Sequence, residues 1–242
     1  MVIPARLESR RFPGKVLARE TGKYLVQHVY ESVLGVPGVT RVIVATDSDE
    51  VLDAAQSFGA EARMTSREHI SGTDRVAEVV RDLEEEIVIN VQGDEPTVRR
   101  EDLSRLVEVL RPDRQPASVM ATLARPRSDP EGVRDPNLVK VVRSLDGRAL
   151  YFSRSPLPGR PAGPIDGETN WLHHIGIYGF RRDFLQVFTS LSPGVLERRE
   201  RLEQLRALEH GYRIEVLTTD HEYEGIDTEE EYRAFVARVG AG

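Results

Sequence analysis

The strongest constraint on the fold is an alternation of short apolar runs and helical patterns in the first half of the chain. The apolar runs have the length of buried strands, and the segments between them repeat apolar side chains every three or four positions. The runs cover residues 2–5, 42–47, 60–64, 87–91 and 119–124, and the helical patterns begin near Leu25, Val51, Val76 and Leu103. This alternation is typical of a doubly wound α/β fold with a mainly parallel sheet.

The second half of the chain has a different pattern. Residues 137–143 and 149–153 predict a hairpin, and residues 173–180 and 213–218 predict two further strands. Residues 155–168 are rich in Pro and Gly, which predicts a mobile loop. An apolar stripe predicts one helix over 196–210, and a terminal helix begins with a capping box formed by Thr228 and Glu231. No break in composition marks a linker, so we expect a single domain.

The composition describes a globular protein and excludes several classes of function. Of the 242 residues, 39% are hydrophobic and 30% are charged, and the net charge is −7. This acidic balance argues against a general nucleic-acid binder, and no apolar run approaches the roughly 18 residues of a membrane span. The chain has no cysteine, and its N-terminus lacks the charge pattern of a signal peptide. We therefore expect a cytoplasmic protein without disulfides and without a membrane or nucleic-acid partner.

The loop after the first strand concentrates positive charge in Arg6, Arg10, Arg11 and Lys15. Gly14 next to a lysine lets backbone N–H groups approach phosphate oxygens, while arginine supplies bidentate donors. Because parallel strands end at one edge of a sheet, we expect this loop, Asp47 and the turn 92–95 to lie there together. The pattern favours a nucleoside triphosphate site, and the alternative is a solvated basic loop.

Two aspartates are candidate metal ligands. Asp94 directly follows a buried strand, and Asp227 lies between the last strand and the last helix. Mg²⁺ prefers hard oxygen ligands and commonly takes one or two carboxylates together with substrate phosphates. The alternatives are an ordinary turn for Asp94 and a helix cap for Asp227.

Further polar residues have both a functional and a purely structural interpretation. Ser71 and Arg75 lie at a predicted helix start, where they suit a nucleotide or simply cap the helix. His174 in an apolar strand is by itself typical of a core residue. Glu200 and Gln204 fit either a solvated helix face or a pocket for a polyhydroxy substrate. No nucleophile–base triad stands out, whereas nucleotidyl transfer needs only positioning, cations and a metal.

The motifs taken together resemble the family of 3-deoxy-manno-octulosonate (KDO) cytidylyltransferases, also called CMP-KDO synthetases. The matching stretches follow the family's order and include IPAR, RFPGK, VIVATD, VINVQGDEP, NLVKVV, ALYFSRSPLP, HHIGIYGF and GIDTEEE. The resemblance implies a Rossmann-like fold of the nucleotide-diphospho-sugar transferase type and a homodimer. It also implies transfer of CMP from CTP to KDO, with release of pyrophosphate, for lipopolysaccharide biosynthesis. Within the single domain it implies a nucleotide-binding half (about 1–125), a sugar-binding and dimerisation region (about 126–226) and a C-terminal segment (227–242).

The resemblance also assigns roles to individual residues by position. Arg6 and Lys15 would hold the CTP phosphates, with Lys15 nearest the α-phosphate and Arg11 assisting. Asp94 and Asp227 would hold Mg²⁺. The residues around the cytidine would be Ala5, Ser71, Arg75 and Gln92. The residues lining the KDO pocket would be Arg154, His174, Tyr178, Glu200 and Gln204.

Two alternatives stay open on the sequence alone. The substrate of a related cytidylyltransferase could be a sialic acid or an amino-modified KDO. The QGDEP and HIGIYG stretches favour KDO over sialic acid, but they do not separate KDO from its close analogues. The second alternative is a catalytically silent nucleotide-binding homologue. The joint presence of Lys15, Asp94 and Asp227 argues against it.

Overall fold

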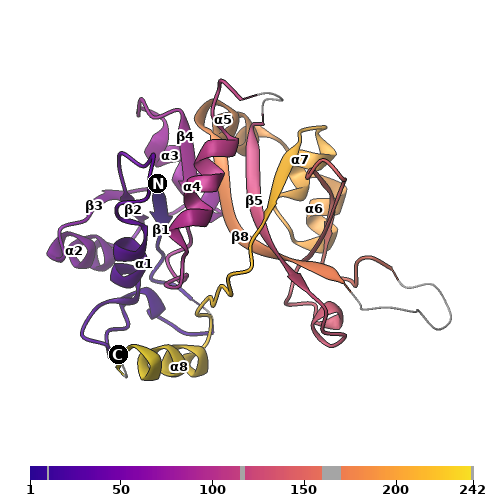
Figure 1. Ribbon diagram of the computed structural model, residues 1–242. Coiled ribbons are helices and arrows are strands. Elements are labelled where there is room, and N and C mark those ends of the chain that lie inside the picture. The colour runs from indigo at the N-terminus through magenta and orange to yellow at the C-terminus, as the bar shows by residue number, and fades with distance from the viewer. Residues whose placement is uncertain (10, 115–117, 160–169, 241–242) are drawn as a thin grey trace. The chain divides into compact units, whose positions relative to one another are not determined.

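The computed structural model describes residues 1–9, 11–114, 118–159 and 170–240 (Figure 1). Arg10 and most of the predicted loop 155–168 lie outside the described residues. The chain forms two compact units, Met1–Ser104 with Glu222–Gly242 and Arg105–His221. The first boundary between them falls inside helix α4 (Arg100–Val109). The three-part subdivision implied by the family resemblance stays a prediction.

A parallel sheet in the order β3-β2-β1-β4 forms the core of the first unit. Its strands are β1 (Val2–Pro4), β2 (Ile43–Thr46), β3 (Glu61–Met64) and β4 (Ile87–Asn90). Val2 of β1 lies opposite Ile43 of β2 on one side and opposite Asn90 of β4 on the other. Strand β1 is therefore flanked on both sides and fully buried, which explains its uninterrupted apolar run. The predicted α/β fold with a mainly parallel sheet is confirmed.

The helices of the first unit follow the predicted apolar stripes. They are α1 (Leu25–Val33), α2 (Asp49–Ser57), α3 (Gly72–Val80) and α8 (Glu229–Gly240), with a short 3-10 helix η1 (Lys15–Leu17). The capping box at the start of α8 is confirmed. Thr228 Oγ1 accepts a hydrogen bond from Glu231 N at 3.2 Å, and a Glu231 carboxylate oxygen accepts one from Thr228 N at 2.9 Å. The described residues contain no helix with the length and apolar character needed to cross a membrane.

Strand β5 (Met120–Arg127) lies at the centre of the second unit. It runs antiparallel to β8 (Trp171–Arg181), which lies beside it in Figure 1, and parallel to β9 (Ile214–Thr218). The predicted hairpin is confirmed as β6 (Lys140–Arg143) and β7 (Ala149–Ser153), and β6 also pairs with β8. A 3-10 helix, η2 (Gly132–Arg134), lies in the connection before β6.

The helices of the second unit differ from the sequence prediction. Helix α5 (Arg182–Ser190) was not expected, although Phe184, Leu185 and Phe188 form its buried face. The expected single helix over 196–210 is wrong, because the segment is divided into α6 (Val195–Glu200) and α7 (Leu205–Glu209). Arg201 adopts a left-handed conformation with φ of 55°, and the carbonyl oxygen of Glu200 accepts a hydrogen bond from Arg154 Nε at 3.0 Å. A side chain from the residue after β7 thus satisfies a carbonyl group at the end of α6.

Candidate functional site

The parallel strands of the first unit bring their following loops to one edge of the sheet. The loop after β1, Asp47 after β2 and the turn after β4 all lie at this edge, as the sequence predicts. An open cavity of about 920 Å³ is lined here by Arg6, Gly14, Asp47 and Arg67 among others. This volume is large enough for a nucleotide-sized ligand.

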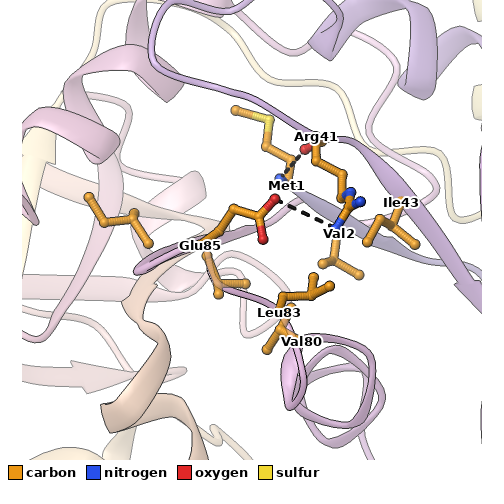
Figure 2. Close-up of a pocket in the computed structure, with 9 residues that line it drawn as sticks. Met1, Val2, Arg41, Ile43, Val80, Leu83 and Glu85 are labelled. Carbon is orange, nitrogen blue, oxygen red and sulfur yellow. Dashed lines mark hydrogen bonds and ion pairs between the residues drawn. The ribbon is translucent and has the colours of Figure 1, made fainter.

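A second cavity in the first unit is unsuitable for a ligand. Figure 2 shows it between Met1, Val2, Ile43, Val80 and Leu83, with Glu85 beside it. Its volume is about 20 Å³, which is room for roughly one water molecule. We place the candidate site of this unit at the edge formed by the carboxyl ends of the strands, where the cavity of about 920 Å³ and the predicted site residue Arg6 lie.

Lys15 joins three segments that are far apart in the sequence. Its Nζ donates hydrogen bonds to Asp94 Oδ2 at 2.5 Å, to Asp227 Oδ1 at 2.9 Å and to the carbonyl oxygen of Ile226 at 3.0 Å. The side chain of Lys15 is only 10% exposed. Asp94 and Asp227, which the sequence alone could not bring together, therefore share one cation.

Local packing explains why these segments meet. The left-handed conformation of Gly14, with φ of 69°, turns the chain directly before Lys15. Phe12 packs on Tyr232 of α8 with ring centroids 5.5 Å apart, and both belong to an apolar cluster with Leu25. The backbone N–H of Ile226 donates to the carbonyl oxygen of Asp94 at 2.8 Å. These contacts hold the opening loop, the turn after β4 and the start of α8 together.

The charges in this cluster perturb one another. Burial opposes the charged form of Lys15, but attraction to Asp94 and hydrogen bonds to both aspartates outweigh it and raise the pKa of Lys15. Burial likewise opposes the charged form of Asp227, but Lys15 and Arg11 lower its pKa. Arg11 Nη2 lies 2.6 Å from Asp227 Oδ2. Asp94 and Asp227 thus form a carboxylate pair balanced by two cations.

Glu95 is a member of this cluster to which sequence reasoning gave no separate role. Its burial, together with the neighbouring carboxylates of Asp94 and Asp227, raises the pKa of Glu95 to about 8. Its Oε2 atom is buried and has no hydrogen-bond partner among the described residues. The only signal in the sequence was its position directly after Asp94, which does not reveal burial.

The residues expected around a nucleoside lie close together at the same edge. A Cβ atom at Gly93 would come within 3.0 Å of the carbonyl oxygen of Pro4 and 3.3 Å of Ala5 Cβ, so only glycine lets these segments approach. Gln92 donates a weak hydrogen bond to Asn90 Oδ1 at 3.3 Å. Asn90 Nδ2 is buried and has no acceptor among the described residues.

Ser71 and Arg75 have clear structural roles. Ser71 caps α3, because its Oγ accepts from Asp74 N and its own N–H donates to Asp74 Oδ2, both at 3.1 Å. The Arg75 side chain is fully buried, donates to Asp47 Oδ2 at 2.6 Å and also hydrogen-bonds to Thr65. Arg75 therefore fixes Asp47 at the wall of the large cavity.

Arg6, which lines the large cavity, is held in place by the backbone of His69. Its Nη2 donates to the carbonyl oxygen of His69 at 3.1 Å. The ring of His69 contacts the carboxylate of Glu78 on α3, and the same carboxylate accepts from Ser66 N at 3.0 Å. The loop between β3 and α3 thus orients an arginine toward the cavity.

His174 and Tyr178 of the second unit lie on either side of a bulge in β8. The register of β5 against β8 shifts so that Thr122 faces Tyr178 while the next residue, Leu123, faces Ile175. Thr122 Oγ1 lies 2.8 Å from the carbonyl oxygen of Ile177 and 3.1 Å from His174 Nε2. If the hydroxyl donates to the carbonyl, Nε2 carries the proton and donates to Thr122. The sequence indicated neither the bulge nor the role of Thr122.

Glu200 is occupied by contacts with β7 and with Arg154. Its Oε1 accepts from Ser153 Oγ at 2.7 Å, and its Oε2 accepts from Arg154 N at 3.0 Å. Burial opposes the charged form of Glu200, but these hydrogen bonds lower its pKa. Gln204 is buried, and its Nε2 has no acceptor among the described residues. Of the predicted sugar-site residues, Gln204 therefore retains an unused donor, whereas both carboxylate oxygens of Glu200 already accept hydrogen bonds.

The burial of His174 predicts a pH-dependent stability. Burial, reinforced by repulsion from His173, lowers the pKa of His174 from 6.5 to about 3, so the folded state holds it neutral. Between these two values the unfolded chain binds more protons, and stability therefore falls as pH drops below about 6.5. The expected loss is on the order of a few kcal/mol and is measured by urea unfolding between pH 4.5 and 7.5. His174→Gln should flatten this dependence, whereas His210→Gln, at an exposed position, should not. An unchanged slope in His174→Gln would contradict the argument.

The chain is similar to known proteins over most of its length. A family profile described as "Cytidylyltransferase" matches residues 1–214. The 3-deoxy-manno-octulosonate cytidylyltransferase of Solibacter usitatus is 48% identical to the chain over 230 residues, which is 95% of this chain and 90% of that protein. The enzyme of the same name from Syntrophobacter fumaroxidans is 47% identical over 238 residues, which is 97% of this chain and 94% of that protein.

A solved structure is similar over nearly the whole chain. It is that of CMP:2-keto-3-deoxy-manno-octonic acid synthetase complexed with CTP, and it is 43% identical to the chain with a TM-score of 0.91. The similarity covers 99% of this chain and 97% of that structure.

Proposed function

Because this chain belongs to the 3-deoxy-manno-octulosonate cytidylyltransferase family, we propose that it transfers CMP from CTP to KDO. The anomeric 2-hydroxyl of KDO attacks the α-phosphorus of CTP, the bond to the β-phosphate oxygen breaks, and pyrophosphate leaves. The convergence of Lys15, Asp94 and Asp227 carries this proposal. It places a cation donor beside paired carboxylates at the edge of the sheet where nucleotides bind.

Asp94 and Asp227 are the proposed ligands of a Mg²⁺ ion. They fit this role because both carboxylates already contact one common cation, the ammonium of Lys15. Two carboxylates are what Mg²⁺ commonly takes from a protein when substrate phosphates and water supply the remaining ligands. When bound, the ion would supply positive charge for the phosphate oxygens and lower the pKa of the attacking hydroxyl.

The cationic side chains have distinct proposed roles on CTP. Lys15, whose three N–H bonds go to Asp94, Asp227 and Ile226, would exchange one carboxylate contact for the α-phosphate, where its compact charge offsets the negative charge that develops during transfer. Arg6 and Arg11 bind the remaining phosphates. Ala5, Ser71, Gln92 and Arg75 surround the cytidine, and Arg75 supports this region through its ion pair with Asp47.

The proposed KDO site uses the donors that remain free in the second unit. Gln204 Nε2 is suited to a sugar hydroxyl and the guanidinium of Arg154 to the sugar carboxylate. His174 and Tyr178 form an aromatic wall, with ring centroids 5.4 Å apart. Glu200 contributes by holding Arg154.

A pyrophosphate-release assay tests the function directly. With CTP and Mg²⁺, we expect release with KDO, weaker release with an amino-modified KDO and none above background with a sialic acid. Omission of the sugar or replacement of CTP by ATP serves as the control. Failure to release pyrophosphate with every sugar acid would exclude the proposed activity, and a preference for another sugar acid would reassign the substrate.

Two accompanying expectations need their own measurements. We expect a homodimer, which sedimentation of the purified protein would detect as twice the mass of the chain. We also expect the protein in the cytoplasm, which fractionation of the source cells would test.

A further inference from the structure

Lys140 is a buried cation in the second unit that has no assigned role in the proposed transfer of CMP. It lies at the start of β6, opposite Ser153 of β7 and His173 of β8, and none of its surface is exposed. Its ammonium has no carboxylate partner within hydrogen-bond distance among the described residues. Instead, Nζ donates to the carbonyl oxygens of Asp135 at 2.8 Å, Leu138 at 2.6 Å and Arg154 at 2.5 Å.

This arrangement uses every donor of the lysine. An ammonium group has three N–H bonds, and here each has one carbonyl acceptor. Burial opposes the charged form and lowers the pKa of Lys140, although the carboxylates of Asp135 and Glu200 partly offset this. A buried cation without a direct counterion costs free energy of folding. Its presence here therefore indicates a functional role for holding these three carbonyl groups together.

The three carbonyl groups belong to two segments, and Arg154 connects them. Arg154 Nη1 donates to the carbonyl oxygen of Pro136 at 3.0 Å, so Arg154 is attached to residues 135–138 both directly and through Lys140. Glu200 holds it from the other side, because Arg154 N and Nε both donate to Glu200 at 3.0 Å. Two of the three guanidinium nitrogens are thus anchored, and Nη2 has no acceptor among the residues that the structure describes.

We propose that Lys140 is a positioning residue for the sugar-acid site, which fixes the backbone of Arg154 so that its free Nη2 meets the substrate carboxylate. This inference rests on the proposed role of Arg154 in binding KDO. A guanidinium forms a strong contact with a carboxylate only in a defined plane, and the bonds of Nε to Glu200 and of Nη1 to Pro136 define that plane. Lys140 ties the backbone of Arg154 to the segment that carries Pro136. Lys140 itself does not touch the substrate, since all of its donors are occupied.

The test measures the KM for KDO and the KM for CTP separately in steady-state kinetics. Lys140→Met keeps the length of the side chain but removes its donors and charge. We expect it to raise the KM for KDO by about 10- to 100-fold, the range of one charge-assisted hydrogen bond, with the KM for CTP unchanged within about twofold. Arg143→Met, at an exposed position of the same strand, is the matched control and should leave both constants unchanged.

A double-mutant cycle with Arg154→Met tests whether Lys140 acts through Arg154. In the Arg154→Met background, Lys140→Met should raise the KM for KDO little further. If Arg154→Met alone leaves the KM for KDO unchanged, the proposed role of Arg154 fails. If Arg154→Met raises it and Lys140→Met does not, or if both substrates are affected equally, the positioning role of Lys140 is overturned.

A second variant keeps the proposal testable if Lys140→Met does not fold. Lys140→Ala leaves a space into which propylammonium can place its charge and donors. Addition of propylammonium chloride should lower the KM for KDO of this variant, whereas the same concentration of potassium chloride should not. Recovery of thermal stability by propylammonium without recovery of the KM for KDO would reduce Lys140 to a purely structural residue.

Discussion

Asp94→Asn should lower turnover by about 10³-fold or more while the protein still folds. The substitution keeps the shape of the side chain but removes a negative charge from the pair that we assign to Mg²⁺. A metal contributes several kcal/mol of charge stabilisation in such reactions, and about 4 kcal/mol corresponds to a factor of about 10³. The measurement is pyrophosphate release from CTP and KDO over a range of Mg²⁺ concentrations.

The dependence of turnover on Mg²⁺ concentration distinguishes the loss of a metal ligand from a general loss of activity. Asp94→Asn should need more Mg²⁺ for its residual activity than the unsubstituted protein does. Asp53→Asn, at an exposed position on α2, is the control and should leave turnover unchanged. Near-normal activity of Asp94→Asn at ordinary Mg²⁺ concentrations would show that the metal assignment is wrong.

Lys15→Met should reduce kcat/KM for CTP by about 10²- to 10³-fold, the cost of removing one preorganised donor from a transition state. Methionine matches the length of lysine but cannot donate to a phosphate. In addition, the substitution leaves Asp94 and Asp227 without the cation that both of them contact. The measurement is steady-state kinetics with CTP varied at saturating KDO, together with thermal unfolding of the variant.

The matched control for Lys15→Met is Lys23→Met. Lys23 is 48% exposed and pairs with Glu31, so its loss should alter neither kinetics nor stability by a measurable amount. Unlike Asp94→Asn, Lys15→Met should not raise the Mg²⁺ requirement, since both proposed ligands remain. A raised Mg²⁺ requirement, or kinetics equal to those of Lys23→Met, would contradict the role assigned to Lys15.

Much of the fold was predictable because its signals are local. The structure has a strand at Val2–Pro4 and a helix at Leu25–Val33, where the sequence predicts them. Both were predictable because burial of one or both faces of an element produces a regular pattern of apolar residues along the sequence. The prediction of a single helix over 196–210 is wrong for a non-local reason. Its interruption at Arg201 accompanies contacts between Glu200 and Arg154, residues that the sequence separates widely.

The candidate site divides in the same way. The cations of the opening loop and the acidic turn after β4 were identified from residue type and from the ends of parallel strands. By contrast, Glu95 and Thr122 gave no usable signal, because their significance depends on burial and on a bulge in a neighbouring strand. The structural roles of Ser71 and Arg75 could be identified only from the structure, because helix capping and ion pairing are recognised from the distances between atoms.

By itself, the sequence determined the α/β class, the edge of the sheet that carries the basic opening loop, and the family to which the chain belongs. These follow from periodicity, strand order and an ordered set of motifs. Only the tertiary structure decided that Lys15 lies between Asp94 and Asp227, and that Lys140 fastens the backbone of Arg154. Such contacts join residues up to 212 positions apart in the sequence. Their interaction energy depends on the distance between the charges and on burial, and a local pattern of residues contains neither quantity.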